Sequence, residues 1–147
     1  MAPAEGYSLA VPIEVRFKDI DMMGHVNNAV YLTYFENARA AYWRALGAWA
    51  GRPESTYVIA QAECDYRSPA TLDDELGCHI RVTRLGRTSF AFQYLLRDEK
   101  SGRTIVEGRS VQVMYDYGEG RPRPLDDDLR DRIRRFEKGP IEEGRRS

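Results

Sequence analysis

The sequence has little of several features that would point to particular protein classes. Its two cysteines, Cys64 and Cys78, have neither CxxC spacing nor a nearby pair of histidines, so neither a disulfide scaffold nor a zinc site is expected. No apolar run approaches the roughly 18–20 residues of a membrane-spanning helix. Because residues 1–10 lack the basic stretch and the apolar core of a signal peptide, we expect a cytoplasmic protein.

An excess of charge of one sign is also missing. The 22 Lys and Arg and 23 Asp and Glu residues give a net charge of -1, which offers no electrostatic case for a nucleic acid partner. A hydrophobic fraction of 42% with 31% charged residues is typical of a globular chain. At 147 residues we expect one domain over residues 11–137, between tails at 1–10 and 138–147.

Hydrophobic periodicity predicts the order strand, long helix, four strands, short helix. Alternation over 13–17 predicts a strand, and an apolar stripe from Tyr31 to Leu46, followed by Gly47, predicts a helix of about sixteen residues. A turn-rich break at 49–55 precedes strands near 58–66, 80–86, 90–96 and 104–117, with Gly108 read as a bulge and His79 as a surface residue. Acidic residues first and basic residues last predict a helix over 126–136, and the chain from 139 onward is expected to fray.

One long helix against an antiparallel sheet is an α+β arrangement. The helix carries enough aromatic residues to be wrapped by the sheet: Tyr31, Tyr34, Phe35 and Tyr42. Such a sheet leaves an edge strand that must be covered or paired. Because a second copy could pair along that edge, we expect at least a dimer.

The most informative segment is 19–39, which reads DIDMMGHVNNAVYLTYFENAR. It places Asp19 and Asp21 ahead of the predicted helix, where backbone N–H groups and the helix dipole favour developing negative charge. A carbonyl bound there would lie near a carboxylate and an imidazole, which is chemistry suited to cleaving an ester or thioester. Structural alternatives remain open, because Asp21 could stabilise a turn, and Asn27 and Asn28 could cap the helix.

The pattern Asp-x-Asp-x-x-Gly-His-Val-Asn-Asn-x-x-Tyr-x-x-Tyr-x-Glu-x-x-Arg resembles the hotdog-fold acyl-CoA thioesterases, nearest to the 4-hydroxybenzoyl-CoA thioesterase-like group. Shorter matches occur at 66–70 and 84–92. The resemblance implies the hotdog fold, a five-stranded antiparallel sheet wrapped around one long helix, and an acyl-CoA substrate. It also implies a homodimer or homotetramer, and no metal or redox cofactor. The aryl-specific members lack the Gly-His-Val-Asn-Asn run, and plant acyl-carrier-protein thioesterases have Asn at the position of Met23.

The resemblance assigns roles to individual residues. It makes Asp21 the nucleophile or the general base for water, and the backbone N–H of Gly24 or His25, at the helix start, the group that polarises the carbonyl. His25 also lines the pocket. The remaining predicted substrate contacts are Asn27, Asn28, Tyr31 and Tyr34 in the pocket and Arg84, Arg87 and Ser89 at the CoA phosphates. Glu36 lies three residues before Arg39, a spacing that suits an ion pair.

Other functions fit the same fold. Enoyl-CoA hydratases on this fold have a pattern like Asp-x-Asn-Pro-x-His, in which the His follows the Asp by five residues. Here His25 follows Asp21 by four residues, and no proline lies between them. A non-catalytic acyl-CoA-binding protein and an acyl-carrier-protein thioesterase both remain alternatives. The sequence leaves open the length of the acyl chain and whether it is aliphatic or aromatic.

Overall fold

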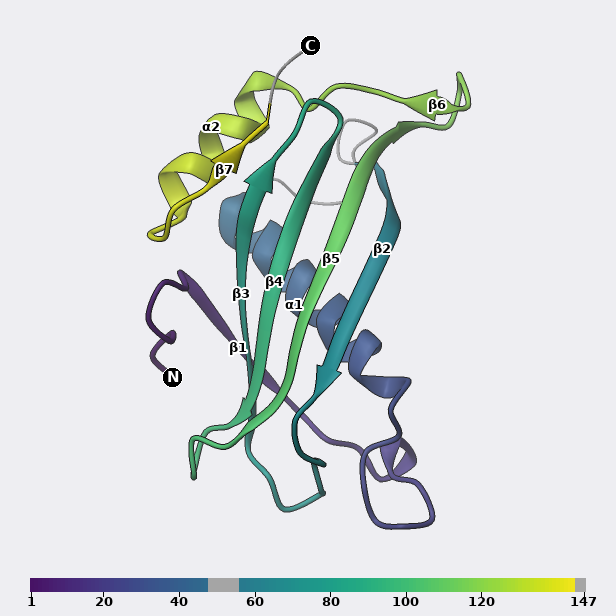
Figure 1. Cartoon of the computed structure of the whole chain (residues 1–147), viewed down its shortest axis with the longest axis vertical. Helices are drawn as coiled ribbons and strands as arrows, with labels where there is room; N and C mark the ends of the chain where they lie inside the picture. The colour runs from purple at the N-terminus through teal and green to yellow at the C-terminus, as the bar shows by residue number, and fades with distance from the viewer. Residues whose placement is uncertain (48–55, 145–147) are drawn as a thin grey trace.

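The computed structural model describes residues 1–47 and 56–144, so the turn predicted at 49–55 lies outside the described residues. The main sheet has the strand order β1-β3-β4-β5-β2, and all neighbours on this path are antiparallel (Figure 1). The strands are β1 (Leu9–Ile13), β2 (Tyr57–Tyr66), β3 (Leu76–Leu85), β4 (Ser89–Asp98) and β5 (Thr104–Asp116). The predicted α+β class with five antiparallel strands is confirmed.

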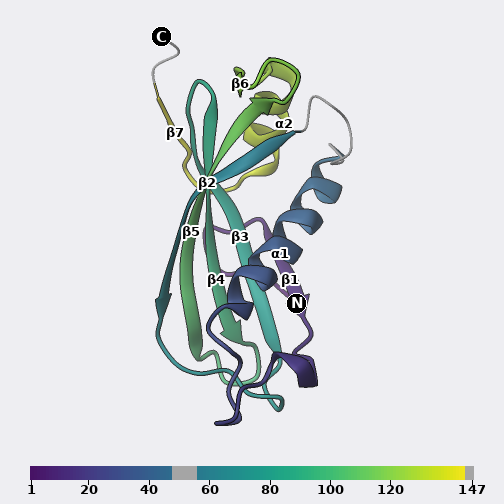
Figure 2. The same cartoon turned by 90° about the vertical axis from the view of Figure 1, so that its right-hand side faces the viewer.

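The long helix α1 (Val30–Leu46) lies along one face of this sheet, as the edge-on view shows (Figure 2). Its buried side chains form the predicted aromatic stripe: Tyr31, Tyr34, Phe35, Ala38, Tyr42, Trp43 and Leu46. The Phe35 ring stacks on Tyr94 of β4 with 4.1 Å between ring centroids. Gly47 ends the helix with φ of 72°, a left-handed conformation that glycine adopts without a Cβ clash.

Shorter elements complete the chain. β6 (Arg121–Pro122) pairs with β5, and the predicted terminal helix is α2 (Asp127–Phe136). Asp126 caps α2 by accepting a 2.7 Å hydrogen bond from the Leu129 N–H. β7 (Glu142–Glu143) pairs in parallel with the end of β3. The chain was expected to fray from residue 139, and for residues 139–144 this expectation was wrong.

The strand predicted at 13–17 was also wrong, because β1 ends at Ile13 and Phe17–Asp19 form a 3-10 turn. The Asp19 side chain accepts a 3.0 Å hydrogen bond from the Arg16 N–H and closes this turn locally. Phe17, which the alternation placed on a buried face, is 84% exposed.

Two further expectations fail because of contacts from distant parts of the chain. Gly108 pairs in register with Cys64 and Tyr94, so it is not a bulge. A Cβ at Gly108 would lie 2.6 Å from the Phe35 ring, which explains the glycine. His79 is fully buried, because N-terminal residues cover β3 and the Ala4 N–H donates to its Nδ1 at 3.0 Å.

We predict that Gly108→Ala destabilises the protein by about 1–3 kcal/mol, because the added methyl group must displace the Phe35 ring. Urea denaturation monitored by circular dichroism measures the free energy of unfolding. Gln93→Ala, at an exposed position on the neighbouring strand, is the control and should change it by less than about 0.5 kcal/mol. Equal stability of Gly108→Ala and the wild type would contradict the packing role of this glycine.

Candidate functional site

The candidate site begins in the loop between the 3-10 turn and α1. Ile20 and Val26 form an isolated antiparallel bridge. Inside it, the Asp21 N–H donates to the His25 carbonyl at 2.8 Å and the Gly24 N–H donates to the Asp21 carbonyl at 3.1 Å. Gly24 has φ of 80°, which suits glycine at the tip of this turn. The backbone of the signature segment is thus a closed turn that presents Asp21.

The Asp21 carboxylate is exposed but held in place. Its Oδ1 accepts hydrogen bonds from the Met23 N–H at 2.9 Å and from the His25 N–H at 3.2 Å. Backbone N–H groups fix one carboxylate oxygen in this arrangement and leave the second oxygen for other partners. The structural interpretation of Asp21 as a turn residue is therefore correct, and it is compatible with a chemical role.

Asp19 has a different environment, with 3% of its surface exposed. Its Oδ2 accepts hydrogen bonds from the Tyr34 hydroxyl at 2.8 Å and from the Arg16 N–H at 3.0 Å. Burial by itself raises the pKa of Asp19, but these hydrogen bonds and the Arg16 charge outweigh burial and lower it. Asp19 therefore fixes the loop on α1 and is shielded from solvent.

A pocket of about 350 Å³ opens beside Asp21. The loop and the start of α1 line one side with Asp21, His25, Val26, Asn28 and Tyr31. The other side consists of residues that follow from the end of β2: Tyr66, Arg67, Ser68 and Pro69. The structure thus brings four residues of the predicted site together. The residues at the end of β2 were not predicted to be part of the site. The signal for it was present, since 66–70 is one of the shorter family matches.

Contacts between the two sides hold the pocket in shape. The Tyr66 hydroxyl donates to the Asn28 carbonyl at 3.1 Å, and the Tyr31 and Tyr66 rings lie 5.6 Å apart. The Ala70 N–H donates to the Tyr31 hydroxyl at 3.2 Å. Arg67 lines the pocket while its guanidinium binds the Glu107 carboxylate at 3.0 and 3.1 Å.

The structure places several predicted site residues differently from their expected positions. α1 begins at Val30, so Gly24 and His25 lie in the turn and not at the helix start, and their N–H groups already donate to Asp21. Tyr34 is 1% exposed, bonds Asp19 and belongs to the core, not to the pocket. Asn27 Oδ1 accepts from the Ala29 N–H at 3.0 Å, which closes a turn before α1, whereas the N-cap position of α1 is Ala29 and no side chain caps it.

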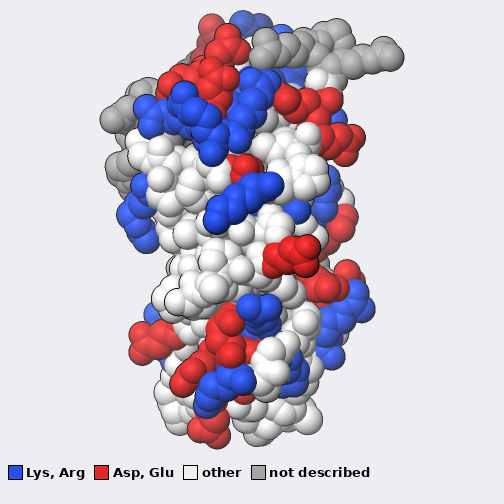
Figure 3. Space-filling model, turned by 90° about the vertical axis from the view of Figure 1, so that its left-hand side faces the viewer, with Lys and Arg blue, Asp and Glu red and all other residues white. Residues whose placement is uncertain are grey.

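The three predicted phosphate contacts lie elsewhere. Arg84, Arg87 and Ser89 are at the β3–β4 hairpin, at the opposite end of the sheet from the Asp21 loop (Figure 1). Figure 3 shows Lys and Arg side chains gathered at the α2 end of the molecule, beside acidic ones, and α2 contributes the exposed Arg134 and Arg135. Within one chain, these residues and Asp21 do not form a common site.

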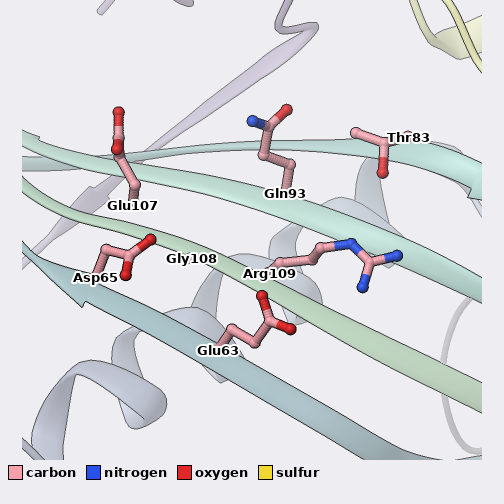
Figure 4. Close-up of a pocket in the computed structure, with 7 residues that line it drawn as sticks. All are labelled: Glu63, Asp65, Thr83, Gln93, Glu107, Gly108 and Arg109. Atoms are coloured by element: carbon pink, nitrogen blue, oxygen red, sulfur yellow. The ribbon is translucent and has the colours of Figure 1, made fainter.

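A second pocket, of about 380 Å³, lies on the face of the sheet turned away from α1 (Figure 4). Side chains from β2, β3, β4 and β5 line it: Glu63, Asp65, Thr83, Gln93, Glu107 and Arg109, together with Gly108. None of these residues is shared with the Asp21 pocket. Arg67 also forms ion pairs with Asp65 and Glu107 along this edge, which is typical of a solvated sheet surface.

Two kinds of feature are absent from the described part of the chain. Within 1–47 and 56–144, no group of three or more His, Cys, Asp and Glu side chains is placed to hold a metal ion. In the same ranges, no helix is long and apolar enough to span a membrane.

Comparison with known proteins places the chain in a family. The family model described as "Thioesterase-like superfamily" matches residues 15–133. The long-chain acyl-CoA thioesterase FadM of Escherichia coli is 27% identical over 131 residues, covering 86% of this chain and 97% of FadM. The acyl-CoA thioester hydrolase YbgC of Shigella flexneri is 29% identical over 122 residues, covering 78% of this chain and 87% of YbgC.

The solved structures agree. A thioesterase from Thermus thermophilus, whose structure is described as a complex with coenzyme A and Zn, superposes with a TM-score of 0.83. It is 37% identical and covers 94% of this chain and 100% of the other. The strand order, the signature segment on its turn and these similarities lead to one conclusion: the chain belongs to the Thioesterase-like superfamily, has the hotdog fold and is an enzyme of the thioesterase class.

Proposed function

We propose that this enzyme hydrolyses an acyl-CoA thioester to a free acid and CoA, and that Asp21 is its nucleophile or general base. The observation that carries the proposal is the Asp21 carboxylate, which two backbone N–H groups hold at the wall of a pocket beside His25 and Asn28. The acyl-CoA names of FadM and YbgC support CoA as the thiol.

The reaction requires attack on the thioester carbon and departure of CoA thiolate. As a general base, Asp21 accepts a proton from water while the water oxygen bonds to the thioester carbon, and the C–S bond then breaks to release CoA thiolate. As a nucleophile, Asp21 itself bonds to that carbon, CoA leaves, and water cleaves the resulting anhydride. In both routes CoA thiolate takes up a proton, and neither route requires a metal or redox cofactor.

The carbonyl oxygen needs a hydrogen-bond donor as negative charge develops on it. The N–H groups of Gly24 and His25 are engaged by Asp21, so they can serve only if the turn opens. The His25 ring and the Asn28 amide line the pocket and need no backbone change. We therefore favour these side chains as the donors.

A second copy of the chain would bring the hairpin arginines to the site. β2 is an edge strand, and its Tyr57 end lies near the β3–β4 hairpin because Met114, the partner of Tyr57, donates to the Thr88 carbonyl. Its other end, at Tyr66, lines the Asp21 pocket. Antiparallel pairing of two β2 strands about a two-fold axis places the start of one strand beside the end of the other. In such a homodimer, Arg84, Arg87 and Ser89 of one copy approach Asp21 of the other.

We predict that Asp21→Asn lowers the rate of acyl-CoA hydrolysis by about 10²–10⁴-fold, because an amide neither accepts the water proton nor attacks the carbonyl. Free thiol release from a panel of acyl-CoAs, from acetyl to palmitoyl with benzoyl and phenylacetyl, measures this rate.

The matched control is Asp73→Asn, an exposed carboxylate outside the pocket, which should keep wild-type turnover. Circular dichroism and the melting temperature of both variants must match the wild type. Undiminished turnover by Asp21→Asn would refute the role of Asp21. If the wild type binds acyl-CoA without releasing free thiol, the protein is a non-catalytic acyl-CoA-binding protein. If it releases thiol only from acyl carrier protein, it is an acyl-carrier-protein thioesterase.

The dimer leads to a separate prediction for mixed subunits. Asp21→Asn and the double variant Arg84→Ala/Arg87→Ala should each be poorly active, whereas a mixture that has exchanged subunits should recover about one quarter of wild-type activity, since about half of random dimers are mixed and each has one intact site. Sedimentation velocity checks that dimers form. Recovery no greater than the sum of the two parent variants would show that Asp21 and the arginines do not act across subunits.

A further inference from the structure

α1 and β2 contact each other at two places along the helix, and one of them lies at the Asp21 pocket. At one end, Tyr66 contacts Tyr31 and Asn28. At the other end, the Trp43 Nε1–H donates to the Tyr57 hydroxyl at 3.1 Å. Between these contacts, apolar side chains on both sides remain open to solvent, with Leu32 of α1 45% exposed and Ile59 of β2 43% exposed.

Between these contacts, the inner face of β2 and β5 carries mostly short side chains. Cys64, Ala62 and Ile59 of β2 pair with Gly108, Ser110 and Gln112 of β5. Paired residues in an antiparallel sheet share a face, and Gly108 faces α1 because it contacts Phe35. The inner face of β2 and β5 therefore has little side-chain volume at Gly108, next to Phe35, and becomes polar toward Ser110 and Gln112.

The polar end is a connected set of hydrogen bonds. Arg39 Nη1–H donates to the Tyr94 hydroxyl at 3.0 Å, and that hydroxyl lies 2.5 Å from Ser110 Oγ. The Gln112 amide also bonds Ser110 Oγ. Gln112 is fully buried, yet its Oε1 has no hydrogen-bond partner among the described residues, which is costly for a buried polar atom.

Arg39 is the unusual member of this set. The expected ion pair with Glu36 does not form. Among the described residues, no carboxylate makes an ion pair with Arg39. Its guanidinium instead interacts with the phenols of Tyr94 and Tyr57. Its side chain is half-buried. A partly buried guanidinium with only neutral partners retains donors in a planar fork that matches a carboxylate.

We propose that Arg39 binds the far end of the acyl group, and that this enzyme prefers acyl chains whose far end carries oxygen, a carboxylate above all. The proposal rests on the proposed function. Arg39 lies eight residues after Tyr31, so at a rise of about 1.5 Å per residue the two are separated by about 12 Å along α1. The acyl chain would run from the thioester at Asp21, past Tyr31 and Tyr66, to Arg39.

The test compares three CoA thioesters of equal chain length: decanoyl-CoA, ω-hydroxydecanoyl-CoA and decanedioyl-CoA, the last with a free terminal carboxylate. We expect the wild type to have kcat/KM at least about tenfold higher for decanedioyl-CoA than for decanoyl-CoA, which corresponds to about 1.4 kcal/mol. Arg39→Met, which keeps an unbranched side chain but removes the guanidinium and its charge, should remove that preference, and Arg39→Lys should retain part of it.

Arg44→Met is the matched control, because Arg44 is exposed on the same helix five residues later. It should keep the wild-type ratio. A wild-type ratio near one, or the same ratio in Arg39→Met, would overturn the inference even if every variant hydrolyses decanoyl-CoA. If Arg39→Met does not fold, the wild-type ratio and Arg39→Lys decide the question. If ω-hydroxydecanoyl-CoA is the preferred thioester, the commitment to a carboxylate is wrong. Absence of hydrolysis of any CoA thioester by the wild type would instead show that the proposed function itself has failed.

Discussion

The hydrogen bond between the Tyr34 hydroxyl and the buried Asp19 carboxylate is the contact on which the site depends. It ties the 3-10 turn and the loop that follows it to α1. The same carboxylate accepts from the Arg16 N–H, and the Asp19 carbonyl accepts from the Asn27 N–H at 2.8 Å. Asp19 thereby fixes both ends of the loop through its carboxylate and its backbone carbonyl, and the lowered pKa of its side chain reflects the stabilisation of the ionised form. Asp21 can remain exposed because Asp19 supplies the structural anchor.

The sheet gives the site its second side and its asymmetry. α1 covers the inner face of the central strands, whereas β2 at the edge contacts the helix through tyrosines at its ends. Mostly short side chains lie on β2 and β5 between these contacts, and Gly108 makes room for the Phe35 ring. The Asp21 pocket, which Tyr31 lines, and the polar cluster at Arg39 therefore lie at two positions along the same helix.

Local patterns gave reliable predictions where local forces decide the structure. The extent of α1, its end at Gly47 and the position of α2 all follow from side chains within one or two turns. Two of the failed predictions involved long-range contacts. His79 is buried by the N-terminal residues, and β7 forms on β3, neither of which leaves a periodic signal. The strand at 13–17 failed because one side chain, Asp19, overrides the alternation.

The sequence by itself determined the class of fold, the order of its main elements and the turn that carries Asp21. Hydrophobic periodicity, residues that end a helix and the signature segment are local properties of the chain, so the sequence displays them directly. Only the tertiary structure decided which groups meet. It brought residues 66–69 to Asp21, moved Tyr34 into the core, separated Arg84 and Arg87 from the pocket, and gave Arg39 phenolic partners in place of Glu36. These outcomes depend on strand register and on the seating of α1, which combine contributions from the whole chain.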